Sequence, residues 1–202
     1  EAARALGVLE EVYGKQAPNG PNSHTSHARQ ANSGSHASPL RHTRPNCCAG
    51  HFIPFFRGML FLRTGDLNAA RHWFATARPL QPDAEATALC AFYEGYALTL
   101  EEDWLAAASA LADAVAAAPD MKEYRNLYGV ALFRLGRHAE AAAQFSDVVV
   151  RLDRGSAMDW QNLGLCRKCM GDAAGARQAL EAALSIEPGL EAAQKHLDEL
   201  PA

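Results

Sequence analysis

The chain has 202 residues and a net charge of −4, and 49% of its residues are apolar. No apolar run approaches the roughly 18 residues that a bilayer-spanning helix needs, and the five cysteines are too irregularly spaced for a disulfide framework. We therefore expect a cytoplasmic protein with reduced thiols, and an all-α fold, because neither β-branched runs nor alternating patterns predict a sheet.

Residues 1–15 are predicted to form a helix, in which Ala5, Leu9 and Val12 keep a small and large spacing that returns later in the chain. This segment is either the second helix of a repeat whose first helix lies upstream of Glu1, or an unrelated helix that caps the domain.

Residues 16–50 change abruptly to Asn, Ser, His, Pro and Gly, a composition typical of a flexible linker. The stretch between Val12 and Gly65 lacks Asp and Glu and carries six positive charges. With few aromatic residues among them, these charges do not predict nucleic-acid binding. The tract also contains potential metal ligands, namely His24, His27, His36, His42, His51, Cys47 and Cys48. Because their spacing is irregular, we expect no metal and no other cofactor.

From residue 51 onward, a pattern of small and large residues returns four times. Its glycines are 37, 34 and 35 residues apart, and each is followed at fixed distances by an alanine, a large apolar residue and usually a proline. The four sets are Gly58, Ala70, Phe74 and Pro82; Gly95, Ala107, Leu111 and Pro119; Gly129, Ala141, Phe145 and Asp153; and Gly164, Ala176, Leu180 and Pro188. Gly and Ala let two antiparallel helices cross closely, and Pro ends the second helix.

The fourth copy also has Trp160, Leu163 and Gly164 at the offsets W-x2-L-G, so the chain from Gly50 onward resembles tetratricopeptide-repeat proteins. The resemblance implies a right-handed α-solenoid of four helix-turn-helix repeats and a capping helix. The expected ranges are 51–84, 88–121, 122–156 and 157–188 for the repeats and 189–202 for the capping helix. Three departures stand out: extra residues before 88, a turn at 101–103 without glycine, and one inserted residue near the end of the third repeat.

In this family, one face of each first helix lines a concave groove that holds another polypeptide. The matching positions here are Phe55, Met59, Phe92, Tyr96, Asn126, Val130, Phe133, Arg134, Gln161, Leu165 and Lys168. The first half of this set is apolar, unlike the Lys, Asn and Arg clamp of co-chaperones that bind the acidic tails of heat-shock proteins. It is more similar to the small bacterial chaperones of secretion translocators. The resemblance thus implies a non-catalytic interaction scaffold or chaperone-like adaptor for a peptide or helix.

The sequence contains no phosphate-binding glycine loop, H-E-x-x-H or G-x-S-x-G motif, so we expect no enzymatic activity. Cys166 and Cys169 form a C-x-x-C pair inside a predicted helix, where we expect ordinary structural cysteines. Three alternatives stay open: a repeat portion of a larger enzyme or assembly subunit, a metal-binding protein that uses the His and Cys tract, and homo-oligomerisation through the groove face.

Overall fold

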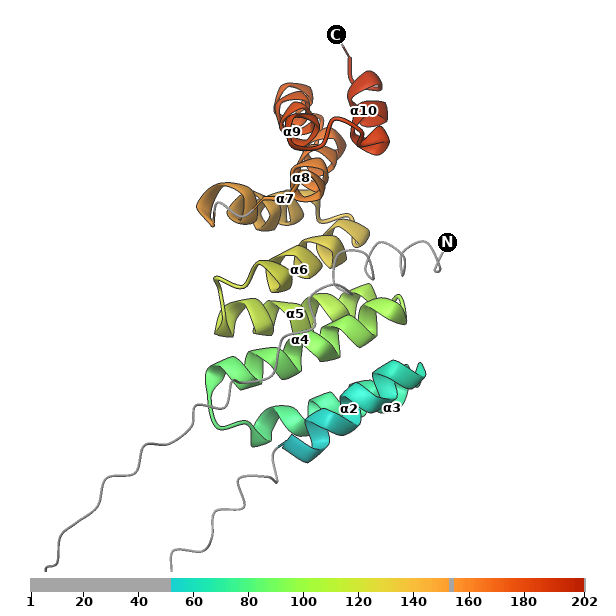
Figure 1. The fold of residues 1–202 in the computed structure, drawn as a ribbon, viewed down its shortest axis with the longest axis vertical. Coiled ribbons are helices and arrows are strands. Elements are labelled where there is room, and N and C mark those ends of the chain that lie inside the picture. The colour runs from blue at the N-terminus through green and yellow to red at the C-terminus, as the bar shows by residue number, and fades with distance from the viewer. Residues whose placement is uncertain (1–51, 153–154, 202) are drawn as a thin grey trace, which may run out of the picture. The chain divides into compact units, whose positions relative to one another are not determined.

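The computed structural model describes residues 52–152 and 155–201, and every regular element in these ranges is a helix (Figure 1). The helix predicted over 1–15, the linker over 16–50 and the histidines and cysteines of that linker lie outside the described residues. The first helices of the hairpins are α2 (Phe52–Thr64), α4 (Ala84–Leu100), α6 (Lys122–Arg134) and α8 (Ala157–Cys169). The second helices are α3 (Leu67–Ala77), α5 (Trp104–Ala117), α7 (His138–Ser146) and α9 (Ala173–Ile186).

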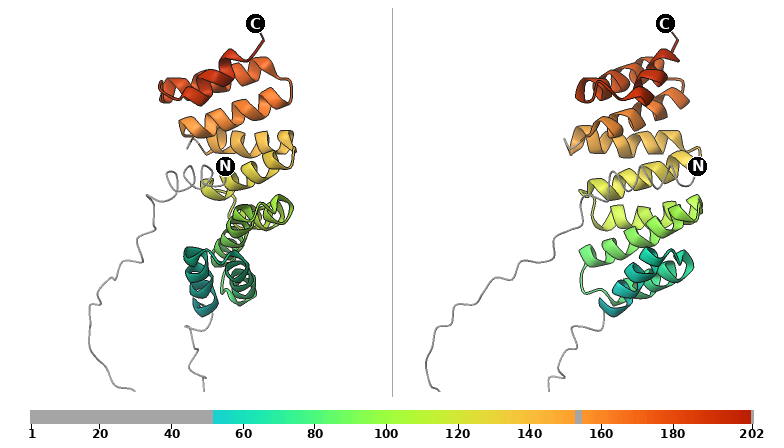
Figure 2. Two further views of the ribbon diagram at one scale, coloured as in Figure 1. Left: turned by 90° about the vertical axis from the view of Figure 1, so that its right-hand side faces the viewer. Right: turned by 45° about the vertical axis from the view of Figure 1, so that its right-hand side comes forward.

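Each helix packs against the next one in the chain, so the hairpins stack in sequence order (Figures 1 and 2). A single turn of 3-10 helix, η1 (Arg78–Leu80), follows α3, and the final helix, α10 (Glu191–Asp198), packs on α9. The all-α solenoid expected from the repeat pattern is confirmed.

The glycine of each repeat marks the point where the two helices of a hairpin touch. A Cβ atom added at Gly129 would lie 2.8 Å from Cζ of Phe145, and one added at Gly58 would lie 2.6 Å from Cε1 of Phe74. Leu111 and Leu180 fill the same space opposite the glycines of the second and fourth repeats. The large residue therefore packs directly on the glycine backbone, which explains the spacing seen in the sequence.

The turns inside the hairpins also repeat. Gly65, Gly136 and Gly171 have φ angles of 80°, 75° and 80°, in the left-handed region that glycine adopts without strain. The second hairpin has Glu102 at this position, with φ of 60°. It is the one non-glycine residue with positive φ among the described residues, and the missing glycine noted in the sequence is thus a strained position.

The extra residues before the second repeat belong to its first helix. Helix α4 begins at Ala84, four residues before the expected start of the repeat at 88. The carboxylate of Asp83 accepts a hydrogen bond from the backbone N–H of Ala86 and so caps the helix. The insertion lengthens a helix because it brings its own N-cap.

The inserted residue of the third repeat appears as a π-helical turn, η2 (Asp147–Arg151), directly after α7. The backbone N–H of Leu152 donates to the carbonyl of Asp147 over 2.9 Å, a bond that spans five residues instead of four. One additional residue is thereby accommodated without ending the helix, and Val148 and Val149 stay buried.

Among the described residues, no helix is both long and apolar enough to cross a membrane.

Candidate functional site

The eleven residues that the sequence predicts for the groove lie on α2, α4, α6 and α8 (Figure 2). We call their common surface the first-helix face. Within it, Met59, Tyr96, Val130 and Leu165 each follow the repeat glycine by one residue, and all four are partly exposed. The structure thus places one large apolar side chain per repeat in a row at the same register.

The α2 part of the face is anchored in the first hydrophobic cluster. Phe55 makes edge contacts with Phe74 and Tyr93, with ring centroids 5.8 and 5.7 Å apart. Met59 packs against the same cluster and, like Phe55, keeps part of its side chain exposed. These two residues are therefore both support and surface.

Phe92 and Tyr96 differ in their exposure. Phe92 is only 9% exposed and stacks on Tyr124 of α6, with ring centroids 4.7 Å apart. Burial raises the pKa of Tyr124 to about 12, as expected for a phenol inside the packing between repeats. Phe92 mainly joins α4 to α6, so Tyr96 supplies the more accessible side chain of the pair.

Asn126 is also buried, and it joins α6 to α8. Its Nδ2 donates to Oδ1 of Asp159 over 2.7 Å, and Nζ of Lys122 lies 2.8 Å from Oδ2 of the same carboxylate. Oδ2 of Asp159 further accepts from the backbone N–H and the hydroxyl of Ser156, which completes a capping box at the start of α8. The sequence analysis missed Asp159, although S-x-x-D before an apolar run signals such a cap.

The α6 end of the face carries an exposed positive charge. Val130 and Phe133 pack partly buried against the cluster around Phe145. Arg134 is exposed, and its guanidinium carbon lies 5.3 Å from the centroid of the Trp104 ring. The aromatic ring orients the guanidinium without neutralising it.

On α8, Gln161 is buried, and Nε2 of Gln161 contacts the sulfur of Met158 at 3.6 Å. Lys168 forms an ion pair with Glu199, which follows α10. Lys168 and His196 lower the pKa of the Glu199 carboxyl by hydrogen bonding to it. The capping segment therefore contributes a partner to the face that the first-helix pattern alone does not predict.

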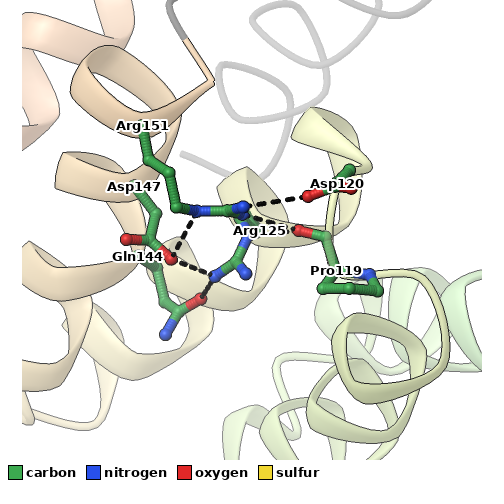
Figure 3. Close-up of polar contacts among 6 residues, drawn as sticks. All are labelled: Pro119, Asp120, Arg125, Gln144, Asp147 and Arg151. Atoms are coloured by element: carbon green, nitrogen blue, oxygen red, sulfur yellow. Dashed lines mark hydrogen bonds and ion pairs between the residues drawn. The ribbon is translucent and has the colours of Figure 1, made fainter.

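A second polar cluster fixes the π-helical turn to the loop between α5 and α6 (Figure 3). Arg125 is 8% exposed, and it donates to the Pro119 carbonyl over 2.6 Å and to Oε1 of Gln144 over 2.9 Å. Its Nη1 also lies 2.7 Å from Oδ2 of Asp147. Arg151 binds the same Pro119 carbonyl and Asp120, at 3.0 and 2.9 Å (Figure 3). These bonds tie α6, α7, η2 and the α5–α6 loop together.

Glu94 departs from the repeat pattern because it faces a cation. Arg78 of η1 lies 3.5 Å from Glu94 and also pairs with Asp113 of α5. Burial raises the pKa of the Glu94 carboxyl, although Arg78 opposes the shift. The two acids and the arginine hold the first two hairpins together.

The C-x-x-C pair has two different environments. Cys166 is fully buried, and burial raises the pKa of its thiol to about 12, whereas Cys169 is exposed. Cys166 is thus a packing residue with an unreactive thiol. The described residues contain no group of three His, Cys, Asp or Glu side chains placed to hold a metal ion.

The comparisons with known proteins support the repeat assignment. A sequence model described as tetratricopeptide repeat matches residues 96–157, and the structure superposes on a crystal structure of MamA with a TM-score of 0.67. The chain is a tetratricopeptide-repeat protein. The MamA match has 20% identity and covers 73% of this chain and 78% of that chain.

Two further tetratricopeptide-repeat structures are similar at the level of the fold. YrrB, described as having an unusual peptide-binding site, matches with 22% identity and a TM-score of 0.64, over 73% of this chain and 74% of that chain. The first repeat domain of Spaghetti (RPAP3), bound to the HSP90 peptide SRMEEVD, matches with 21% identity and a TM-score of 0.54, over 57% and 90%. No curated protein sequence matches.

Two surface hollows of this tetratricopeptide-repeat domain lie away from the first-helix face. The larger, about 600 Å³, is lined by polar residues of α10, among them Glu191, Gln194 and Lys195. The smaller, about 290 Å³, lies between Glu85 and the α5–α6 loop. Neither is lined by the first-helix-face residues.

Proposed function

We propose that this protein is a non-catalytic interaction scaffold, with a chaperone-like adaptor role, that binds an apolar peptide or helix on its first-helix face. The observation that carries the proposal is the row of Met59, Tyr96, Val130 and Leu165. Each is large, apolar and partly exposed, and each sits at the same register of a rigid hairpin. A row of this kind suits a partner that runs along the stack and places one apolar side chain against each repeat.

Rigid support below this row favours binding, because a preorganised surface loses little entropy when a partner docks. Phe92 stacked on Tyr124 and Asn126 bonded to Asp159 fix the spacing between α4, α6 and α8. Side chains such as Tyr96 can then take up a partner without rearrangement of the helices.

The charges near the row give the partner a direction. Arg134 stays exposed beside Trp104, and Lys168 lies at the α8 end. We therefore expect a partner whose apolar residues face α2 and α4 and whose acidic residues face α6 and α8. The peptides bound by YrrB and RPAP3 support peptide recognition as a use of this fold.

Peptide selection tests the proposal. Twelve-residue peptides selected from a random library on the full chain should be apolar, with acidic residues toward one end. Tyr96→Ala should weaken their binding about 30-fold in fluorescence anisotropy, since removal of a central aromatic contact costs about 2 kcal/mol. Leu105→Ala is the matched control, because Leu105 is a large exposed residue of α5, outside the face. Equal affinity for the wild-type chain and Tyr96→Ala would refute the proposed site.

A further inference from the structure

The outward side of α2 exposes three large apolar residues. Ile53, Phe56 and Leu60 are 54%, 64% and 59% exposed, and their spacing of three and four residues places them on one helix face. This surface, which we call the α2 outer face, differs from the first-helix face, whose α2 members are Phe55 and Met59. An exposed apolar group of this size on a helix marks an interaction site.

The repeat register shows what kind of surface this is. Ile53, Phe56 and Leu60 stand five before, two before and two after the repeat glycine. In α4 the same positions hold Cys90, Tyr93 and Ala97, and in α6 they hold Tyr124, Leu127 and Ala131. Five of these six residues are at most 4% exposed, and Tyr93 is half-buried.

The second helix of the preceding repeat covers these positions. Phe74 of α3 stacks on Tyr93, with ring centroids 5.5 Å apart, and Ala70 and Phe74 share a cluster with Ala97. The α2 outer face is therefore shaped to receive a helix that packs as α3 packs on α4. Such a helix needs a small residue, then a large one four positions later, then another small or β-branched one after three more, as in Ala141, Phe145 and Val148.

The sequence at 1–14 meets this requirement. Ala5, Leu9 and Val12 have the spacing of Ala141, Phe145 and Val148. Its side-chain charges also complement those of α2. Residues 1–14 contain three glutamates and one arginine, whereas α2 contains Arg57 and Arg63 and no acidic residue. A second copy of α2 on this face would instead bring like charges together.

We propose that the α2 outer face is a helix-binding surface and that residues 1–14 of this chain form the helix that covers it. The segment would act as the second helix of an incomplete repeat and close the apolar end of the stack. At the other end, α10 already presents a polar outer surface. The proposal does not depend on the partner of the first-helix face.

Thiol labelling tests this in the full chain. A cysteine at position 60 should react with a small maleimide at least tenfold more slowly than a cysteine at position 105, as measured by mass spectrometry of the peptides that contain Leu60→Cys and Leu105→Cys. Leu60 and Leu105 are 59% and 71% exposed in the described part of the chain, so without a covering helix the two rates should be similar. Reading the labelled peptides separately keeps the native cysteines out of the measurement.

Two charge variants identify the covering segment. Leu9→Asp, combined with Leu60→Cys, should raise the labelling rate to that of the position-105 reference, whereas Ala3→Asp, on the opposite side of the predicted helix, should leave it slow. Equal rates at positions 60 and 105 in the otherwise wild-type chain would overturn the proposal. Slow labelling that Leu9→Asp does not relieve, or that disappears on dilution together with a dimer mass in light scattering, would overturn it as well. Hydrogen exchange of α2 in the wild-type and Leu9→Asp chains gives the same comparison without a cysteine.

Discussion

Replacing Glu102 by glycine should stabilise the protein, because Glu102 is held in the left-handed region with φ of 60°. This conformation costs a non-glycine residue about 1–2 kcal/mol. Glycine returns about 0.4–1 kcal/mol of that gain through the larger entropy of the unfolded chain. We therefore expect the free energy of unfolding of Glu102→Gly to rise by about 0.5–1 kcal/mol.

Urea denaturation followed by circular dichroism measures this change, since the slope should stay constant while the midpoint rises. The reciprocal change, Gly136→Glu, is the matched control. Gly136 occupies the same turn position with φ of 75°, and an added Cβ meets no atom within 4 Å, so backbone strain is the main difference. Gly136→Glu should lower the free energy of unfolding by a similar amount. An unchanged or lower midpoint for Glu102→Gly would refute the reasoning.

Three further predictions concern packing, buried ions and pH. Gly129→Ala should lower the free energy of unfolding by about 1–3 kcal/mol, because the new Cβ would lie 2.8 Å from Phe145; a neutral result in urea would contradict the close crossing. Arg125→Met should cost about 2–3 kcal/mol and Arg151→Met under about 1 kcal/mol in thermal unfolding, since Arg125 is buried and the Arg151 side chain is 45% exposed; equal losses would argue against the arrangement in Figure 3. Because the pKa of Glu94 is raised, the folded state holds its proton more tightly, so stability falls as pH rises from the ordinary glutamate pKa through the raised one; Glu94→Gln should remove this loss, and an unchanged pH profile would contradict it.

The hairpin frame was predictable because its determinants are close in sequence and recur. Gly129 and Phe145 lie 16 residues apart and touch, and the same pair returns in every repeat. Sequence spacing alone then fixes the helix order. It could not decide whether the extra residues near Asp83 form a loop or a turn of helix, because that depends on whether a side chain caps the new end.

The exposure of the candidate site was less predictable, because it depends on the next repeat. Phe55, Phe92 and Asn126 occupy the same register, yet only Phe55 keeps part of its side chain exposed. Tyr124 and Asp159, on the following first helices, bury the other two. Pattern matching ranks all members of a register equally, whereas packing between repeats separates supporting residues from surface residues.

Hydrogen–deuterium exchange on the full chain, with and without a selected peptide, tests the central claim most directly. The account predicts slower exchange in α4 and α6, which carry Tyr96 and Val130, and no change in α5 and α7. Protection that falls on α5 and α7, or on α10 alone, would contradict a partner bound to the first-helix face.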